Sequence, residues 1–169
     1  TFSSWFNLND LNSNNNTMWE RRLTGNSGVT FNDILIDSDG NIVVVGKTSA
    51  TDLITGSKTG SFVVKYDSDG NELWRNIYGS SSNSEFLSIV EDNNGNYVMA
   101  GHHEANAWGY VIDKIGTEVL SKTSGATNYR YQYEEVMINS AGNYVFIGES
   151  VSSGGAASFC YTSSGYSYF

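Results

Sequence analysis

The sequence predicts an all-β protein, and three observations support this prediction. The chain has 169 residues, 14% of them aromatic, with 18 glycines and only three methionines, which favours strands joined by tight turns over helices. One sequence pattern occurs three times without a gap, and each copy places a short polar turn between two apolar runs. With 39% hydrophobic residues, the chain can bury a substantial core as a single domain.

The repeat is carried by three aligned segments. They are residues 31–46 (FNDILIDSDGNIVVVG), 86–101 (FLSIVEDNNGNYVMAG) and 133–148 (YEEVMINSAGNYVFIG). All three share an aromatic residue, an aliphatic pair, an Asp or Asn, then Gly-Asn, an Ile or Tyr, Val, and a Gly three residues later. Such self-similarity at a period of about 50 residues indicates a repeat architecture.

Each copy is predicted to form a β-hairpin, because a turn containing glycine separates its two apolar runs. Gly40 can adopt a positive φ at no steric cost, and the carboxylates of Asp37 and Asp39 can accept hydrogen bonds from nearby backbone N–H groups. Residues 42–45 (IVVV) are apolar on both faces. We therefore expect these strands to be covered on both sides by neighbouring sheets.

A second hairpin follows each of the first two copies, so the repeating unit has four strands. Residues 62–79 (FVVKYDSDGNELWRNIYG) and 111–125 (VIDKIGTEVLSKTSG) align when the Asp-Ser-Asp part of the first turn is shortened. The alignment matches Lys65 with Lys114, Gly70 with Gly116, Glu72 with Glu118, and Trp74 with Leu120. Four-stranded units of about this length are typical of the blades of a β-propeller.

The chain is therefore predicted to be one partial β-propeller domain, residues 1–169, with blades at about 1–25 (a half blade), 26–79, 80–125 and 126–169. Residues 2–25 resemble a degenerate third-and-fourth-strand pair, with Trp19 displaced by one residue from the place of Trp74. Residues 159–169 begin a second hairpin. Because a propeller needs about four blades or more to close, the ring would be completed by residues outside the chain, by another chain, or not at all.

By these residues the chain resembles secreted bacterial β-propeller repeat proteins, whose blades carry a Trp-containing outer strand and an Asp-x-x-Gly-Asn-x-Val-x-x-Gly hairpin. Residues 73–80 (LWRNIYGS) and 92–101 (DNNGNYVMAG) carry the resemblance, which extends over nearly the whole chain. The third unit departs from it in its Tyr- and Ser-rich end. The resemblance implies an extracellular or cell-surface setting and specifies an architecture, not a reaction.

The charge of the chain excludes some classes of partner. Eighteen acidic residues against nine basic residues give a formal net charge of −9, which would repel nucleic acid and anionic lipid alike. No window approaches the roughly 18 to 20 consecutive apolar residues of a spanning helix, so no membrane insertion is expected. The first residue is Thr1, which suits a processed segment whose export signal lies elsewhere. The single Cys160 allows no intrachain disulfide and is expected to be a small buried side chain.

Two turns raise the question of a metal, although no metal or other cofactor is predicted. The Asp-x-Asp-Gly turns that invite a calcium interpretation lie at Asp37 and Asp39 and at Asp67 and Asp69. The twelfth position from each first Asp is not the bidentate Glu that a helix–loop–helix calcium site requires. A plain hairpin turn is therefore favoured, with a weakly bound cation as the alternative.

The two histidines do not indicate a catalytic or metal centre. His102 and His103 are adjacent in a predicted strand, so their rings should point to opposite faces and should not converge on one ion. We expect both to be exposed residues at a strand end. Neither a Gly-x-Ser-x-Gly elbow nor a nearby Cys–His arrangement is present, and the chain is predicted not to be an enzyme.

Aromatic residues favour ligand binding, because exposed rings offer apolar faces with polar edges. The predicted ligand-binding residues are Trp108, Tyr110, Tyr129 and Tyr131, and packing between blades is the alternative for each of them. The expected function is a non-catalytic extracellular or cell-surface module that binds a glycan or protein ligand.

The alternative function is structural, and a homo-oligomer is expected. Incomplete blades leave edge strands that could pair between copies. Two copies of about three and a half blades would then close a seven-bladed ring, or the contact would extend into a filament.

Overall fold

The computed structural model describes residues 2–9, 17–25, 27–50, 59–79, 81–125, 130–150, 155–162 and 165–168. These residues form strands joined by turns, and no helix occurs among them. The strands build antiparallel sheets, three of which have four strands each. The predicted all-β fold class is therefore confirmed.

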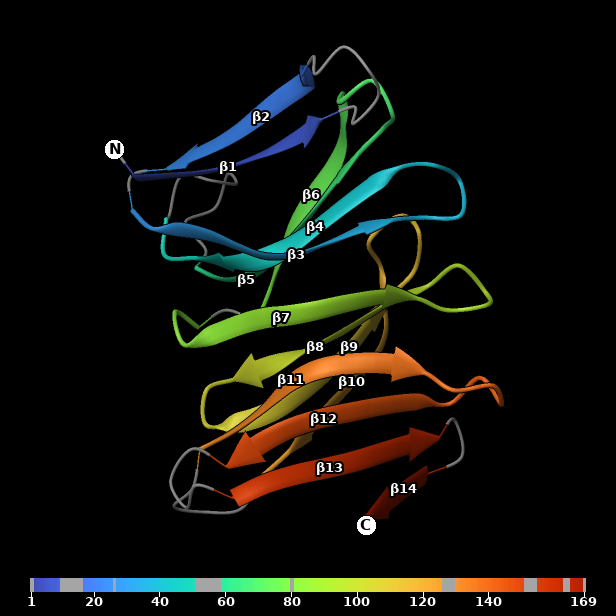
Figure 1. The fold of residues 1–169 in the computed structure, drawn as a ribbon. Coiled ribbons are helices and arrows are strands. Elements are labelled where there is room, and N and C mark those ends of the chain that lie inside the picture. Colours follow the sequence, from blue (N-terminus) through green and yellow to red (C-terminus); the bar gives the residue numbers. More distant parts are fainter. Residues whose placement is uncertain are drawn as a thin grey trace.

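Four sheets follow one another along the chain, and within each sheet the strands are adjacent in sequence order (Figure 1). Sheet I consists of β1 (Phe2–Asn9) and β2 (Thr17–Gly25). Sheet II consists of β3 (Val29–Ile36), β4 (Ile42–Thr48), β5 (Gly60–Tyr66) and β6 (Glu72–Tyr78). Sheet III consists of β7 (Ser84–Glu91), β8 (Tyr97–His103), β9 (Asn106–Ile112) and β10 (Glu118–Ser124). Sheet IV consists of β11 (Tyr131–Ile138), β12 (Tyr144–Ser150), β13 (Gly155–Thr162) and β14 (Gly165–Tyr168).

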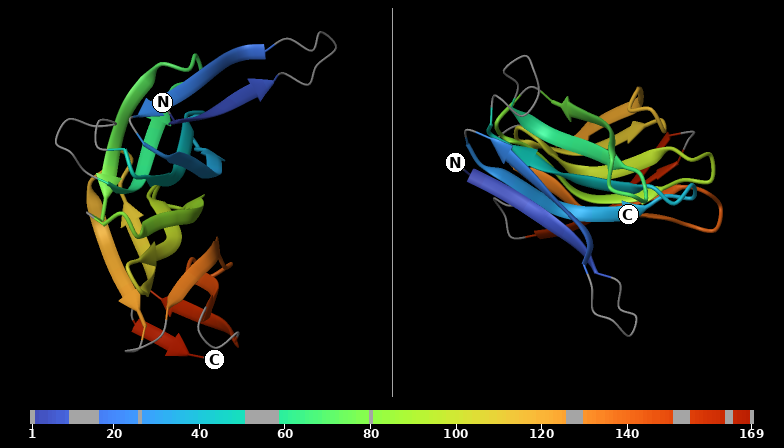
Figure 2. Two further views of the ribbon diagram at one scale, coloured as in Figure 1. Left: turned by 90° about the vertical axis from the view of Figure 1, so that its left-hand side faces the viewer. Right: turned by 90° about the horizontal axis from the view of Figure 1, so that it is seen from above.

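The sheets are stacked one on the next, and their first strands lie along one side of the stack (Figures 1 and 2). Strand β3 lies against β7, and β7 lies against β11. Hydrogen bonds tie these strands together, because Ile89 N donates to Asp33 Oδ2 at 2.9 Å and Val136 N donates to Ser88 Oγ at 3.5 Å. We call β3, β7 and β11 the inner strands of a partial β-propeller whose blades are the stacked sheets.

Apolar residues on both faces of the strands fill the spaces between the sheets. In β4, Val43 and Val45 pack in the cluster between sheets II and III, whereas Ile42 and Val44 pack with Leu23 in the cluster between sheets I and II. All of these side chains are buried. The prediction that the IVVV strand is covered on both sides is therefore confirmed.

The glycine that ends each copy of the repeat is required by a close backbone approach. Gly46, Gly101 and Gly148 each pair with the aromatic residue that begins the same copy, and a β-bulge follows that aromatic residue in all three sheets. A Cβ at any of these glycines would overlap the carbonyl oxygen of the residue before the aromatic. The repeated aromatic and glycine thus belong to one feature, a bulge in the inner strand.

The β5–β6 and β9–β10 hairpins have turns of equal length. This finding corrects the alignment of the two hairpins that was predicted from the sequence. The backbone of Asp67 bonds to Asn71, and that of Asp113 bonds to Thr117 in the same way. The two segments therefore align without a gap, and the match of Lys65 with Lys114 is wrong. The turn fixes the register from its first Asp to its Gly, so Val111 is the counterpart of Lys65 and Ser68 is the counterpart of Lys114. The other three matched pairs agree with the strand register.

Sheet I corresponds to the outer half of a blade. Trp19 Nε1 donates to the carbonyl oxygen of Ser68 at 3.0 Å, as Trp74 Nε1 donates to that of Lys114 at 3.1 Å. Because Ser68 and Lys114 are equivalent turn positions, Trp19 occupies the place of Trp74. Two copies of the chain would each contain the same outer half. In the predicted seven-bladed dimer, the two copies of sheet I would have to form one blade, with one copy supplying the inner half and the other the outer half. Because both copies supply the outer half, sheet I of one copy does not complete sheet I of another.

Candidate functional site

Five similar turns lie at one end of the stack, which we call the turn end. They span residues 37–41, 67–71, 92–96, 113–117 and 139–143. In the first of them, Asp37 Oδ1 accepts hydrogen bonds from the backbone N–H groups of Asp39 and Asn41, at 3.0 and 2.8 Å. Asp67 does the same in the second turn. These are hairpin turns, as predicted, and within the described ranges no group of three or more His, Cys, Asp or Glu residues could hold a metal ion.

A buried charged cluster joins sheets II and III beneath the turn end. Asp37 Oδ2 lies 3.0 Å from Lys65 Nζ and accepts a 2.6 Å hydrogen bond from Tyr97 OH. Lys65 Nζ also donates to Tyr97 OH at 2.8 Å, and all three side chains are buried. Burial raises the pKa of Asp37, but hydrogen bonds from Tyr97 and Asn41 outweigh that effect and hold its pKa well below the usual range. Asp37 is therefore a fixed anion that anchors one blade to the next.

The same contact recurs between sheets III and IV. Tyr144 is the counterpart of Tyr97 at the start of the second strand, and its hydroxyl donates to Asp92 Oδ2 at 2.7 Å. Burial raises the pKa of Asp92, yet hydrogen bonds from Asn96 and Tyr144 lower it below its usual value overall. A tyrosine from sheet III and one from sheet IV thus each fix the first turn of the preceding sheet.

Cross-sheet contacts also hold the exposed parts of the turns in place. Glu91 accepts hydrogen bonds from Ser38 N and Ser38 Oγ, at 2.6 and 2.7 Å. Lys114 lies over Gly95 and pairs with Asp39, with 2.6 Å between Nζ and Oδ2. The turn end is therefore a connected surface, although its residues come from segments far apart in the sequence.

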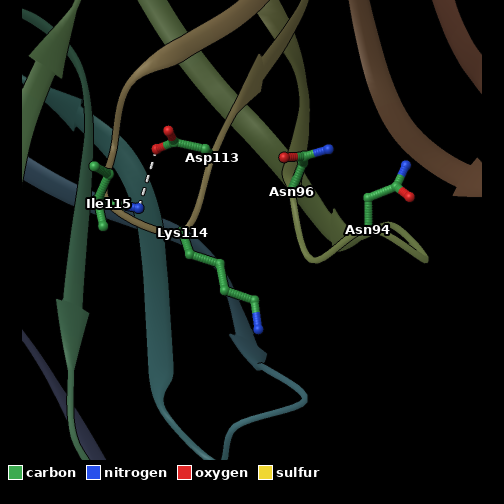
Figure 3. Close-up of a pocket in the computed structure, with 5 residues that line it drawn as sticks. All are labelled: Asn94, Asn96, Asp113, Lys114 and Ile115. Carbon is green, nitrogen blue, oxygen red and sulfur yellow. Dashed lines mark hydrogen bonds between the residues drawn. The ribbon is translucent and has the colours of Figure 1, made fainter.

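Two hollows flank the turn at residues 92–96. The first has a volume of about 290 Å³ and lies between Asn94 and Asn96 on one turn and Asp113, Lys114 and Ile115 on the facing turn (Figure 3). The second has a volume of about 300 Å³ and is lined by Asp92, Asn93, Asn94, Ile138, Gly142 and Tyr144. Small-molecule sites are mostly apolar, whereas the lining here is largely amide and carboxylate. Such hollows suit polar groups presented by a larger ligand.

The structure separates the four aromatic residues that were predicted to bind a ligand. Trp108 and Tyr110 are buried between sheets II and III, where Trp108 stacks on Phe86 with 4.9 Å between ring centroids. Their burial agrees with the alternative interpretation, packing between blades, because alternate residues of β9 share the face that sheet II covers. Tyr131 is half-buried at the start of β11. Tyr129 lies outside the described residues, and its ligand binding stays a prediction.

The two histidines point to opposite faces of β8, as predicted. His103 Nδ1 lies 2.6 Å from Ser84 Oγ, and its ring contacts Trp108 on the side of sheet II. His102 is buried on the other side, with Nε2 3.3 Å from Arg130 Nη2. Burial and the charge of Arg130 lower the pKa of His102. The predicted exposure of His102 is wrong, because strand β11 of sheet IV packs against β8 and Arg130, just before β11, lies at the His102 ring.

Sequence reasoning missed the residues that tie the turns and sheets together. For Lys65 the sequence does indicate a partner, since this residue is a lone charge in the apolar run FVVKY and a buried charge needs a partner. For Glu91 and Lys114 the sequence indicates no partner, because Ser38 and Asp39, which bond to them, lie in another blade.

Comparison with known proteins adds one similarity. No protein-family model matches the chain. Over 99 residues, 51% of the chain, it is 32% identical to an uncharacterized WD repeat-containing protein of Acanthamoeba polyphaga mimivirus, and it spans 7% of that relative's length. In the part of the chain that the structure describes, no helix is long and apolar enough to cross a membrane. The secreted bacterial type stays a prediction, whereas the four-stranded sheets and the similarity together support a repeat of the β-propeller type.

Proposed function

We propose that the chain is a non-catalytic β-propeller module that binds a protein partner at its turn end. The observation that supports this most is the connected surface that the Ser38–Glu91 and Lys114–Asp39 contacts create between two blades. A surface held in place before binding loses little conformational entropy when a partner docks. The similarity to a WD repeat-containing protein favours a protein partner over a small molecule.

The partner that fits this surface carries basic groups. Asp69 is exposed at the turn end, and Asp113 borders the first hollow. Lys114, the basic residue of that hollow, is already paired with Asp39. The net charge of −9 acts in the same direction over longer distances. A cationic segment would therefore be attracted to the turn end, and its association would depend on salt.

Binding of the purified chain to arrays of basic peptides, acidic peptides and glycans tests the proposal. We expect basic peptides to bind, and their binding to weaken between about 0.1 M and about 1 M salt, because the screening length shrinks from about 10 Å to about 3 Å. Asn94→Lys, in the first hollow, should weaken binding about tenfold. The matched control is Thr123→Lys, which adds the same charge at an exposed position of β10.

Two outcomes would contradict the proposal. An equal loss of binding in both lysine variants would mean that only net charge matters and that the turn end is not the site. Binding of glycans without any peptide would favour the carbohydrate ligand that the aromatic composition first suggested.

A second candidate function is self-assembly through the uncovered face of sheet IV, the face on which no other sheet of the described residues packs. Met137 and Ile147 are 43% and 42% exposed on this face, whereas their counterparts in sheet III, Val90 and Ala100, pack against sheet IV. A second copy placed here would continue the stack in a head-to-tail contact, which leads to a ring or a filament. Sedimentation of the chain over a range of concentrations tests this candidate.

A further inference from the structure

The inner strand of sheet II is less covered than those of sheets III and IV. Ile34 of β3 is 46% exposed, whereas Ile89 and Val136, at the same position of β7 and β11, are 4% and 2% exposed. Ile36, two residues later on the same face, is 63% exposed. In sheets III and IV this face packs against a complete preceding sheet, whereas sheet I contributes only two strands among the described residues.

The backbone of β3 shows the same difference. The amides of Ile89 and Val136 donate to a side chain on the preceding inner strand, Asp33 and Ser88 respectively. The equivalent amide of Ile34 bonds instead to the carboxylate of the adjacent residue in its own strand, with 2.8 Å between Ile34 N and Asp33 Oδ1. Among the described residues, sheet II thus lacks an acceptor that both of the following sheets receive from a neighbour.

Sheet I also has a free edge at the corresponding place. Strand β1 pairs with β2, and no other strand in the described ranges pairs with it. The contact between Trp19 and Ser68 makes β1 the counterpart of the third strands β5 and β9. Those strands pair on their inner edge with the second strands β4 and β8. The free edge of β1 therefore corresponds to the edge at which a second strand would pair.

We propose that β1 and the exposed face of β3 form a docking site for a β-hairpin with this chain's own repeat pattern. The second strand of the hairpin pairs with β1, which is recognition by strand addition. Its first strand covers Ile34 and offers the Ile34 amide an Asp or Ser located two residues after the aromatic residue. Its turn lies beside Ile36, as the turn at residues 92–96 borders a hollow with Ile138.

The occupant is a hairpin from polypeptide other than residues 1–169. The three hairpins of this pattern in the chain already pair on their outer edge with β5, β9 and β13. A second copy therefore has no unpaired hairpin to donate. This inference is independent of the partner proposed for the turn end, because the residues of the two sites differ.

A synthetic peptide with the sequence of residues 84–103 (SEFLSIVEDNNGNYVMAGHH) tests the site. We choose this hairpin because it belongs to the sheet that packs against Val136, and its turn borders a hollow with Ile138. Val136 and Ile138 are the counterparts of Ile34 and Ile36. We expect the peptide to bind the full chain saturably and to slow hydrogen exchange of the β1 amides. A scrambled peptide of the same composition should do neither.

A pair of variants locates the contact. Ile34→Asp should weaken peptide binding about tenfold or more, because it removes an aliphatic side chain that the hairpin buries. Val119→Asp, at an exposed position of the outer strand β10, should leave peptide binding unchanged. The exchange measurement on the unmodified chain keeps the test decisive if Ile34→Asp fails to fold.

Three results would overturn the proposal. The first is equal binding of the hairpin peptide and the scrambled peptide, and the second is peptide binding without slower exchange in β1. The third is protection of β1 that grows with the concentration of the chain in the absence of peptide, which would assign the site to a second copy.

Discussion

At the scale of the residue, the glycines that end the repeats and the glycines in the turns have different physical roles. A Cβ at Gly101 would overlap the carbonyl oxygen of Glu85 on the paired strand, which cannot move without disturbing the ladder. At Gly142 nothing lies within 4 Å of a Cβ, and only the positive φ of 79° disfavours a side chain. The first requirement is steric and long-range in sequence, and the second is local.

Alanine substitutions should separate the two roles. Gly101→Ala should lower the free energy of unfolding by about 3 kcal/mol or more, because the bulge must rearrange to relieve the overlap. Gly142→Ala should lower it by about 1 kcal/mol, the cost of a left-handed conformation for a residue with a side chain. Urea unfolding followed by circular dichroism measures both. Equal losses would show that the bulge yields to an added methyl group.

The lowered pKa of Asp37 predicts that the free energy of unfolding depends on pH in the acidic range. The pKa of its carboxyl in the folded state is held below the unfolded value of 3.8. Its contribution is therefore fully present above the unfolded pKa and is lost as the pH falls towards the folded pKa. Asp37→Asn should cost about 3 kcal/mol at neutral pH, because it leaves Lys65 buried without a counterion.

The pH test compares Asp37→Asn with Asp69→Asn, which removes an exposed carboxylate of a neighbouring turn. Thermal unfolding measured from about pH 7 down to about pH 2 should show the difference between Asp37→Asn and the unmodified chain shrinking below about pH 4. Asp69→Asn should follow the unmodified chain throughout. A constant difference at all pH values would mean that Asp37 contributes through packing and not through its charge.

At the scale of the element, the hairpins were predictable and the contacts between them were not. The apolar runs and the Asp-x-x-Gly-Asn turns at residues 37–41 and 92–96 are local signals, so the strands and their both-sided burial follow from the sequence. The bond from Ser38 to Glu91 joins two blades, and no local pattern indicates it. Alternation likewise places Trp108 and Tyr110 on one face of a strand, but it does not tell whether another sheet covers that face.

Strand β9 therefore contributes to stability through its aromatic residues. Trp108→Ala should lower the free energy of unfolding by about 3 to 5 kcal/mol, because it empties a buried volume between sheets II and III. Val119→Ala, at an exposed position of the adjacent strand β10, should change it by less than about 0.5 kcal/mol. Chemical unfolding of the two variants measures both effects. Full stability of Trp108→Ala together with loss of a ligand would restore the binding role first predicted for this residue.

At the scale of the whole molecule, the stack has faces that differ in what covers them. Among the described residues, sheets II and III have neighbours on both sides, whereas sheet IV has a neighbour on one side only (Figure 1). The first strand of sheet II is covered less than its counterparts because sheet I supplies only an outer strand pair. Ile34 and Ile147, which are exposed in these places, have the buried counterparts Ile89 and Ala100 in sheet III. Comparison of equivalent positions in the repeat thus indicates two places where a further element could pack, the exposed face of β3 and the uncovered face of sheet IV.

Charge placed on the uncovered face of sheet IV should prevent association without harming the fold. The double variant Met137→Lys, Ile147→Lys replaces two half-exposed side chains, so we expect its free energy of unfolding to change by about 0.5 kcal/mol per site or less. If copies stack through this face, the average mass of the unmodified chain in sedimentation should rise with concentration, while the double variant remains a monomer. The matched control Leu73→Lys, Val119→Lys adds the same charge to outer strands and should associate as the unmodified chain does. A monomeric unmodified chain at every concentration would contradict self-assembly, and equal suppression by both double variants would attribute the association to net charge and not to this face.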